Sequence, residues 1–456
     1  MALLEVFMVL LNSFIAIFVA IIVYYKNCYN FWKNKKIPYL TPKIPLGNSQ
    51  NPFFRKSSSY EQLKLIYDRM RSENVNHCGI YDFTTPIYFP IDLGVIKNVF
   101  GEQILFNKNY FRFNFEDDSK IERLFETILK CSQQMVDGLK KFENKSQPID
   151  IDEVLRCFMV DVIKNCGFGV KSNGFLDDYL RFTPYKKFGV IKKNPIFEII
   201  SKKLKMLEKN DFFFEIVKES VKFREENRLK KSDFLQILID ENWEIYKEVD
   251  YEEKIALKAL DFFSTSFKTA INVLTFSLYE LAKNLDVQDK LRLEIWNFNQ
   301  FDYEKIKKFE YMNQVIEETL RKYPLVPIIN KSFNKSYRLP GSDSTLEKGT
   351  KIQIATFAIQ RDPNFFPKPD YFIPERFSNE NKTKIDPLSY LPFGLEPKSP
   401  IGVKFGLLQT KIALTMLLKD YKVSLNFNTK DPLKFDKNNS LLVANDKIWL
   451  DVNKVN

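Results

Sequence analysis

Histidine and cysteine are scarce in this 456-residue sequence, and their placement restricts the metal chemistry that the chain supports. The only histidine is His77, and all five cysteines lie in the N-terminal part of the chain (Cys28, Cys78, Cys131, Cys157 and Cys166). The cysteines lack the paired spacing of a zinc site, and their odd number favours free thiols over a disulfide framework. The chain beyond Cys166 therefore contains neither thiolate nor imidazole ligands.

The sequence also lacks internal repeats, low-complexity tracts and basic runs with interleaved aromatics, and the last absence argues against nucleic-acid binding. Instead, 45% of the residues are hydrophobic and 43 are phenylalanine, which is enough for a large packed core. The formal net charge of +11 has two interpretations. It is either a solvated lysine surface or a basic face for anionic lipid or an acidic redox partner.

The N-terminus differs in composition from the rest of the chain. Residues 1–25 carry one charge, Glu5, and roughly 20 apolar-dominated residues, the length of a membrane-spanning helix. The alternatives are a cleaved signal peptide, which usually has a basic start and a small-residue cleavage site, and a buried core helix. Several lysines follow from Lys26 onward, so the positive-inside rule predicts a cytosolic location for the remaining chain. We predict a transmembrane signal-anchor over 1–25.

After the anchor, we predict a proline-rich hinge over 26–50 and one mainly helical domain with a minor β-sheet over 51–456. Apolar residues recur three and four apart in the segments 120–142 and 151–169, which is typical of helices. Residues 79–92 resemble a hairpin, Ile352 and Ile354 alternate as in a strand, and the C-terminal segment 432–456 suggests strands joined by polar turns.

Three motifs follow one another in the C-terminal half. In EETLRKYP (317–324), Glu318 and Arg321 are three residues apart on a predicted helix and can pair. Alone, such a pair is typically a surface feature contributing a few tenths of a kcal/mol. A proline-broken segment then ends in PERF, which contains Arg376, and the loop PFGLEPKSPIGVKFG (392–406) follows.

The order of these motifs resembles that of the cytochrome P-450 superfamily, the haem-thiolate monooxygenases. The likeness extends over nearly the whole chain, and microsomal, xenobiotic-metabolising members of insect type look most similar. The resemblance implies a cytochrome P-450 fold behind an N-terminal transmembrane helix, anchored in the endoplasmic reticulum membrane with the main domain in the cytosol. It also implies a haem cofactor, an apolar small-molecule ligand and an NADPH-dependent reductase as partner. Glu318, Arg321 and Arg376 would form a buried network in which removing one partner strands a charge.

The loop that holds the haem iron departs from the family pattern, which reads roughly F-G-x-G-x-R-x-C-x-G. Phe393, Gly394 and Gly402 keep the frame, and Lys398 replaces the arginine. Pro400 stands at the position of the axial cysteine, so the expected metal-ligand position has no side-chain donor atom. The thiolate favours O–O cleavage in this family, whereas proline has neither a side-chain donor nor an N–H.

Other haem-handling features are altered as well. The family's A-G-x-[DE]-T becomes Thr265-Ser266-Phe267-Lys268-Thr269. Thr269 keeps the hydroxyl of the proton-delivery position, or is an ordinary helix threonine bonded to a preceding carbonyl. Lys268 reverses the charge of the relay acid. Tyr390 and Met416 are residue types that ligate haem elsewhere, but neither occupies the ligand position.

Two further differences concern the haem propionates. Glu396 replaces a glycine and would place a negative charge beside them. The segment 104–120 contains Arg112 but no W-x-x-x-R pattern.

Three hypotheses about function remain open. The first is a membrane-anchored pseudoenzyme that has lost thiolate-haem catalysis and binds an apolar ligand or a reductase. The second is an active monooxygenase that oxidises apolar substrates, and the third is a decayed or mispredicted gene product. On the ligand inventory we expect haem to be unbound, or bound without a thiolate ligand.

Overall fold

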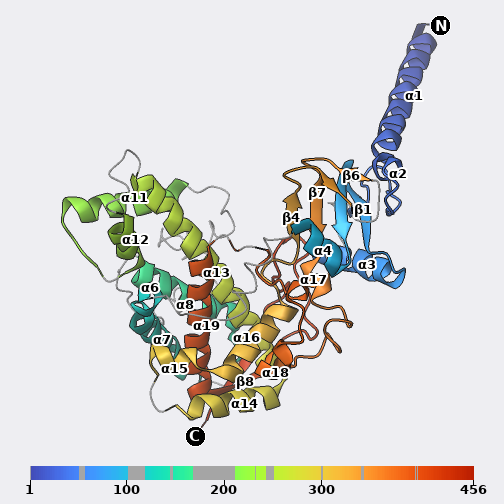
Figure 1. Ribbon diagram of the computed structural model, residues 1–456. Coiled ribbons are helices and arrows are strands. Elements are labelled where there is room, and N and C mark those ends of the chain that lie inside the picture. The colour runs from blue at the N-terminus through green and yellow to red at the C-terminus, as the bar shows by residue number, and fades with distance from the viewer. Residues whose placement is uncertain are drawn as a thin grey trace.

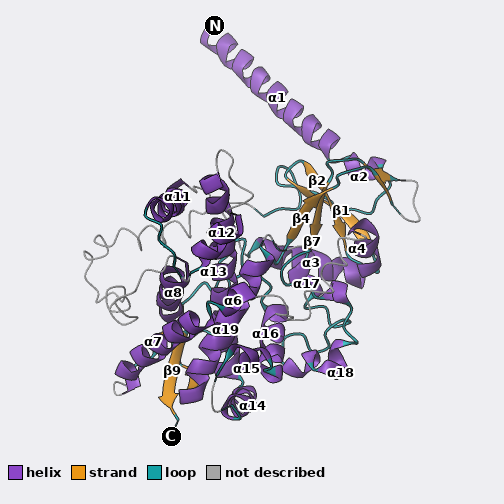
Figure 2. Cartoon of the chain, turned by 60° about the vertical axis from the view of Figure 1, so that its left-hand side comes forward, coloured by secondary structure: helices purple, strands orange, loops and turns teal. Residues whose placement is uncertain are grey.

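The computed structural model describes residues 2–50, 57–100, 119–143, 147–167, 211–231, 233–242, 251–298, 301–339, 344–395, 397 and 399–455. Helices make up most of the described chain, and the strands form small sheets, as the apolar pattern predicts (Figure 2). The predicted fold class, mainly α with a minor sheet, is confirmed.

The α-helices vary from single turns to a helix of 33 residues. They are α1 (Ala2–Cys28), α2 (Phe31–Asn34), α3 (Ser59–Ser72), α4 (Leu93–Phe100), α6 (Ser119–Glu122), α7 (Phe125–Glu143), α8 (Ile151–Val162), α11 (Asp211–Glu226), α12 (Phe234–Asn242), α13 (Tyr251–Lys283), α14 (Leu285–Trp296), α15 (Tyr303–Lys307), α16 (Glu310–Lys322), α17 (Thr356–Ile359), α18 (Asn379–Lys382) and α19 (Pro400–Asp420). A π-helical turn, η2 (Ile163–Gly167), extends α8, and the 3₁₀ turns η4 (Pro374–Phe377) and η5 (Pro387–Ser389) lie in the proline-broken region.

The largest described sheet has the strand order β1-β2-β7-β4. Strands β1 and β2 form the predicted hairpin, β2 pairs in parallel with β7, and β7 pairs antiparallel with β4. The second sheet has the order β3-β9-β8, and β5 pairs with β6. The strands are β1 (His77–Asp82), β2 (Thr85–Pro90), β3 (Ile149–Asp150), β4 (Ile329–Ser332), β5 (Tyr337–Arg338), β6 (Thr345–Leu346), β7 (Lys351–Ile354), β8 (Tyr421–Leu425) and β9 (Trp449–Lys454).

Two local expectations need correction. Within its described part, the C-terminal segment 432–456 contains a single strand, β9, and one isolated bridge between Phe435 and Ala444. The stretch between the two bridge residues is rich in Asn, Lys and Asp, so it forms turns rather than alternating strand positions. The helix expected over 120–142 is interrupted between α6 and α7, while its apolar positions still face the core.

Helix α1 projects away from the domain, as Figure 1 shows, and its apolar side chains are exposed. Two described helices are long and apolar enough to cross a membrane by length and composition, α1 and α19. Their burial distinguishes them. None of the apolar window in the N-terminal helix is buried, whereas 89% of that in α19 is, so α19 is a core helix and α1 is the candidate anchor.

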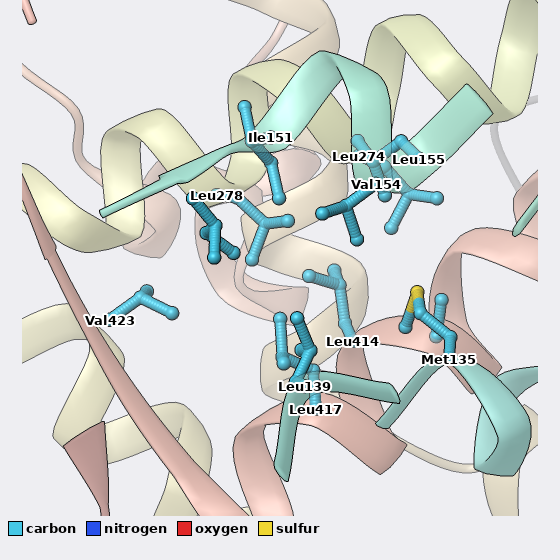
Figure 3. A pocket seen from close by; sticks show the side chains of 12 residues that line it. Met135, Leu139, Ile151, Val154, Leu155, Leu274, Leu278, Leu414, Leu417 and Val423 are labelled. Carbon is cyan, nitrogen blue, oxygen red and sulfur yellow. The ribbon is translucent and has the colours of Figure 1, made fainter. Parts of the chain in front are cut away.

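The core is built around α13 and α19, which lie side by side in Figures 1 and 2. Helices α7, α8, α14 and α16 pack around this pair, and the β1-β2-β7-β4 sheet forms a second apolar cluster beside it. Figure 3 shows the space where α7, α8, α13 and α19 converge, lined by aliphatic side chains such as Leu139, Leu274 and Leu414. The void there is about 10 Å³ and wholly apolar, so the helices fill this part of the core.

Candidate functional site

Glu318 is at the centre of a buried ionic network. Its carboxylate accepts hydrogen bonds from Arg321 Nε at 2.7 Å and Arg321 Nη2 at 2.9 Å, one turn away on α16. Arg376 Nε, from the 3₁₀ turn η4, lies 3.4 Å from Glu318 Oε1, and the backbone N–H of Ile373 donates to the same oxygen at 2.9 Å. The side chains of Glu318 and Arg321 have no exposed surface. The three residues singled out in the sequence therefore meet in one cluster.

The network joins α16 to the segment that follows β7. Arg321 donates to the carbonyl oxygens of Gln360 at 3.0 Å and Tyr371 at 3.2 Å, and Arg376 donates to that of Lys368 at 2.9 Å. Burial lowers the pKa of Arg376, and the Glu318 carboxylate opposes that shift. In this buried environment the charged side chains are paired with opposite charges or with backbone carbonyl groups. The cluster therefore holds α16 and the segment after β7 together.

The start of the candidate haem loop keeps a defined shape. Gly394 has a φ of +80°, a conformation that side chains rarely adopt, and it packs beside Val326. The carbonyl oxygen of Pro392 accepts a hydrogen bond from Val326 N at 3.0 Å, and Phe393 packs against the main core. The loop is thus held against the segment after α16. Three positions named above lie outside the described residues: Arg112, Glu396 and Lys398.

Pro400 occupies the first position of α19, where its missing N–H has no cost. Ser399 is the N-cap, and its hydroxyl oxygen accepts a hydrogen bond from Gly402 N at 3.3 Å. Pro400 is exposed to solvent, whereas Ser399 is buried. The position at which the resemblance places the axial ligand is therefore occupied by a helix-initiating proline on the surface.

Helices α13 and α19 touch through two glycines four residues apart. A Cβ added at Gly402 would lie 2.9 Å from the carbonyl oxygen of Phe262 and 3.1 Å from the Cβ of Thr265. A Cβ added at Gly406 would lie 2.7 Å from both the Ser266 carbonyl oxygen and the Thr269 Cβ. The two backbones approach each other directly because these positions carry no side chain.

An aromatic stack closes the same interface beside these two glycines. Phe262 of α13 lies between Phe234 of α12, at a ring-centroid distance of 3.4 Å, and Phe405 of α19, at 5.0 Å. Phe263 packs edge-on against Phe262 at 5.1 Å, and its ring also covers Gly167 of η2. All four phenylalanines are buried. The region between α12, α13 and α19 is therefore filled by side chains.

These contacts decide whether the described residues accommodate a haem. If Thr269 and Pro400 hold the positions that the resemblance assigns to them, a bound haem would lie between Thr269 and the start of α19. Instead, Thr269 is 1% exposed and packs against Gly406. Among the described residues, this contact leaves no space for a haem between Thr269 of α13 and Gly406 of α19.

The remaining residues whose types could ligate a haem iron make other contacts or lie in other parts of the fold. The Tyr390 hydroxyl donates to the carbonyl oxygen of Glu317 at 3.0 Å, and Met416 is buried in the C-terminal half of α19. Burial raises the pKa of the Cys166 thiol well above its usual range, which disfavours the metal-binding thiolate. His77 begins β1, in the sheet region. Within the described ranges, no three His, Cys, Asp or Glu residues cluster as a metal site would require.

A cleft of about 450 Å³ lies outside this closed interface. Its walls come from the β1-β2 hairpin, the start of α3 and the segment after α16. Apolar side chains of Ile80, Leu325 and Ile328 and polar groups of Asn48 and Gln62 line it. The sequence contains no motif that indicates this cleft, because it joins an N-terminal segment to one in the C-terminal half of the chain.

The fold agrees with the comparison to known proteins. The sequence model described as "Cytochrome P450" matches residues 101–452, and the chain belongs to this family. The insect-type resemblance is also confirmed by individual relatives. Cytochrome P450 6a8 of Drosophila melanogaster is 29% identical over 96% of this chain and 97% of its own length. Cytochrome P450 6k1 of Blattella germanica is 28% identical over 95% of this chain and 94% of its own length.

Proposed function

We propose that the protein is a membrane-anchored pseudoenzyme of the cytochrome P450 family that does not perform thiolate-haem catalysis. The contact between Gly406 and Thr269 carries this proposal. Two independent features support it, since Pro400 supplies no donor atom and the helices that would flank a haem pack against each other. Each feature alone would disfavour the monooxygenase reaction.

The test is haem content and ligation in the purified full-length protein. We expect a haem-to-protein ratio far below one and no thiolate-type Soret band in the carbon monoxide difference spectrum of the reduced protein. A Pro400→Cys variant supplies the matched control. It restores the ligand but leaves the interface closed, so we expect it to lack the band as well.

The spectra of the wild type and of Pro400→Cys distinguish the effect of the missing ligand from the effect of helix packing. A stoichiometric thiolate-type band in the wild type would restore the active-monooxygenase hypothesis. A band in Pro400→Cys alone would mean that the missing ligand, and not helix packing, prevents haem binding.

We infer that the remaining function is binding, and that the cleft takes an apolar small molecule with a polar end. Its size and its mixture of aliphatic walls with a few amide and hydroxyl groups support this class of ligand. A thermal-shift screen with apolar small molecules tests it. A compound that raises the Tm of the wild type should not raise that of Leu325→Asp, which places a charge in the apolar wall. A screen without any stabilising compound would contradict the inference.

Membership of the family also supports a proposal about the location and the redox partner. We propose anchoring in the endoplasmic reticulum membrane by α1 and contact with an NADPH-dependent reductase through a basic face. Co-purification of the reductase with full-length protein from microsomes tests the partner. Loss of that association at high salt would support an electrostatic contact, and no association at low salt would argue against it.

A further inference from the structure

Helix α1 carries a polar amide inside its apolar span. Glu5 and Lys26 are the charged residues at its two ends, and the helix rises about 30 Å between them, which matches the hydrocarbon core of a bilayer. Asn12 lies about 10 Å along the helix from Glu5. When α1 spans a membrane, this amide is therefore within the hydrocarbon, where a polar group without hydrogen-bond partners is costly.

Among the described residues, no other part of the chain reaches the Asn12 amide. Helix α1 projects away from the domain (Figure 1), and its side chains from Leu4 to Ile21 are all exposed. Lipid tails offer neither donors nor acceptors. A partner for the amide within the bilayer therefore has to come from another helix.

Asn12 belongs to a row of valine and alanine residues that runs along one side of α1. The members of this row recur three and four positions apart, which is the spacing of the contact positions in paired helices. They are Val9, Asn12, Ala16, Val19 and Val23, and we call them the Asn12 seam. Without large side chains in the seam, the backbone of a second helix can approach closely.

The phenylalanines of the span lie on the other side of the helix. With 3.6 residues per turn, Phe7, Phe14 and Phe18 are about 120–160° around the axis from Asn12. The bulky aromatic side chains therefore face lipid when the seam faces a partner helix.

Contacts at the base of α1 show that the seam faces away from the domain. Tyr25 packs against the apolar cluster that contains Trp32. Its ring lies 5.8 Å from that of Tyr29, which in turn lies 5.0 Å from that of Tyr81 in β1. Val23, the last seam residue, is on the opposite side of the helix from Tyr25 and is 51% exposed. The domain thus leaves the seam open to a second helix.

A second copy of this chain is the partner that matches the seam. All copies insert in the same direction, so their anchors are parallel, and a symmetric pair places each seam residue opposite itself. Asn12 then faces Asn12, and because an amide both donates and accepts, the two side chains can form reciprocal hydrogen bonds. One polar residue among apolar contact positions also fixes the register of paired helices. The like charges of Glu5 and Lys26 come together only at the helix ends, where salt screens them.

We propose that the anchors of two copies of this chain pair in parallel along the Asn12 seam, with the two Asn12 amides hydrogen-bonded to each other. This inference rests on the proposed anchoring of the protein by α1. It gives the anchor a second role, because the pair holds two domains together on the same side of the membrane.

Disulfide cross-linking maps which side of α1 contacts the second copy. Full-length protein in phosphatidylcholine vesicles carries one added cysteine in a Cys28→Ser background, since the other cysteines are buried. Oxidation with copper phenanthroline should cross-link Val19→Cys to a dimer severalfold faster than Phe18→Cys, which has nearly the same depth but lies outside the seam. Equal rates at the two positions would indicate random collision and would overturn the proposal.

The Asn12 amide is tested by energy transfer between donor- and acceptor-labelled copies in the same vesicles. The label is attached to Leu4→Cys, again with Cys28→Ser, because Leu4 is 69% exposed near the start of α1. We expect transfer to fall severalfold in Asn12→Leu and to persist in Asn12→Gln, which keeps an amide. The matched control is Ser13→Leu, which removes a polar group one residue away but outside the seam, and its transfer should be nearly unchanged. Full transfer in Asn12→Leu would overturn the amide contact.

Alkaline carbonate extraction of the vesicles distinguishes this proposal from the anchoring on which it rests. If carbonate releases the wild type, α1 does not span the membrane and the proposed anchoring fails. If the wild type is retained but shows no energy transfer, only the pairing is overturned. Transfer that occurs in microsomes but not in vesicles of purified protein would assign the seam to a helix of another protein and would likewise overturn the pairing.

Discussion

The Glu318 network and the α13–α19 interface are both buried, yet they differ in how much of the family pattern they keep. In the network, each of the three charged residues finds its partners at hydrogen-bonding distance. In the interface, the position expected to carry the ligand is a proline, and the two helices touch. The charged contacts that support the fold are thus complete in a chain whose expected ligand position carries no side-chain donor.

The largest effect is expected from Glu318→Ala. The substitution leaves Arg321 buried without its carboxylate, which costs about 3–5 kcal/mol and approaches the full stability of many domains. We expect little folded protein, measured by chemical denaturation in detergent. The control is Glu304→Ala, because Glu304 is 60% exposed and pairs with Lys307 only at 3.7 Å. A similar, small change in both variants would show that the network does not support the fold.

A smaller loss is expected from Gly406→Ala. Alanine is normally favoured over glycine in helices by about 1 kcal/mol, but here the new methyl would meet the Ser266 backbone. We expect a net destabilisation of about 1–3 kcal/mol from overpacking, measured by chemical denaturation. Gly94→Ala in α4 is the matched control, since its methyl would meet only the Asp92 side chain. A stabilised Gly406→Ala would mean that α13 and α19 are separated in solution.

The smallest effect concerns pH. Lys411 on α19 faces Glu317 and Glu294, with Lys307 also nearby, and burial lowers its pKa to about 7 from 10.5. Between these values the unfolded chain binds more protons than the folded chain, so this group makes stability rise with pH. Lys411→Met should remove that rise and stabilise the protein at pH 6 by about 1 kcal/mol or more. Tm measured from about pH 6 to pH 9 checks this.

The exposed Lys419 on the same helix provides the control for this experiment, as Lys419→Met. Burial also raises the pKa of Glu317 to about 7, against the opposing effects of Lys382 and Lys411. Stability contributed by Glu317 therefore falls as pH rises from 4.5 to about 7. An unchanged pH profile in Lys411→Met would show that Lys411 titrates as in the unfolded chain.

Local patterns in the sequence were sufficient to predict several structural features. The hairpin follows from two β-prone runs around a turn, and the Glu318–Arg321 pair follows from helical spacing. The contact with Arg376 came from the resemblance to the family, since it joins residues 58 positions apart. The likeness to haem-thiolate proteins also located the loop that starts α19.

Features set by tertiary packing were not predictable. The contact of Gly402 with Thr265 depends on the register of two helices that are far apart in the sequence. A buried lysine such as Lys411 contradicts the usual exposure of this residue type, and nothing in its neighbours indicates it. The positive φ of Phe83 is likewise invisible in a sequence in which turns favour glycine.

The position of α19 also has a consequence for the order in which the protein can fold. This helix is the central partner of α13, yet it begins at Pro400, far downstream of the end of α13 at Lys283. The apolar face of α13 therefore stays uncovered during synthesis until α19 has left the ribosome. Packing of α13 against α19 is then a late event relative to the emergence of α13 itself.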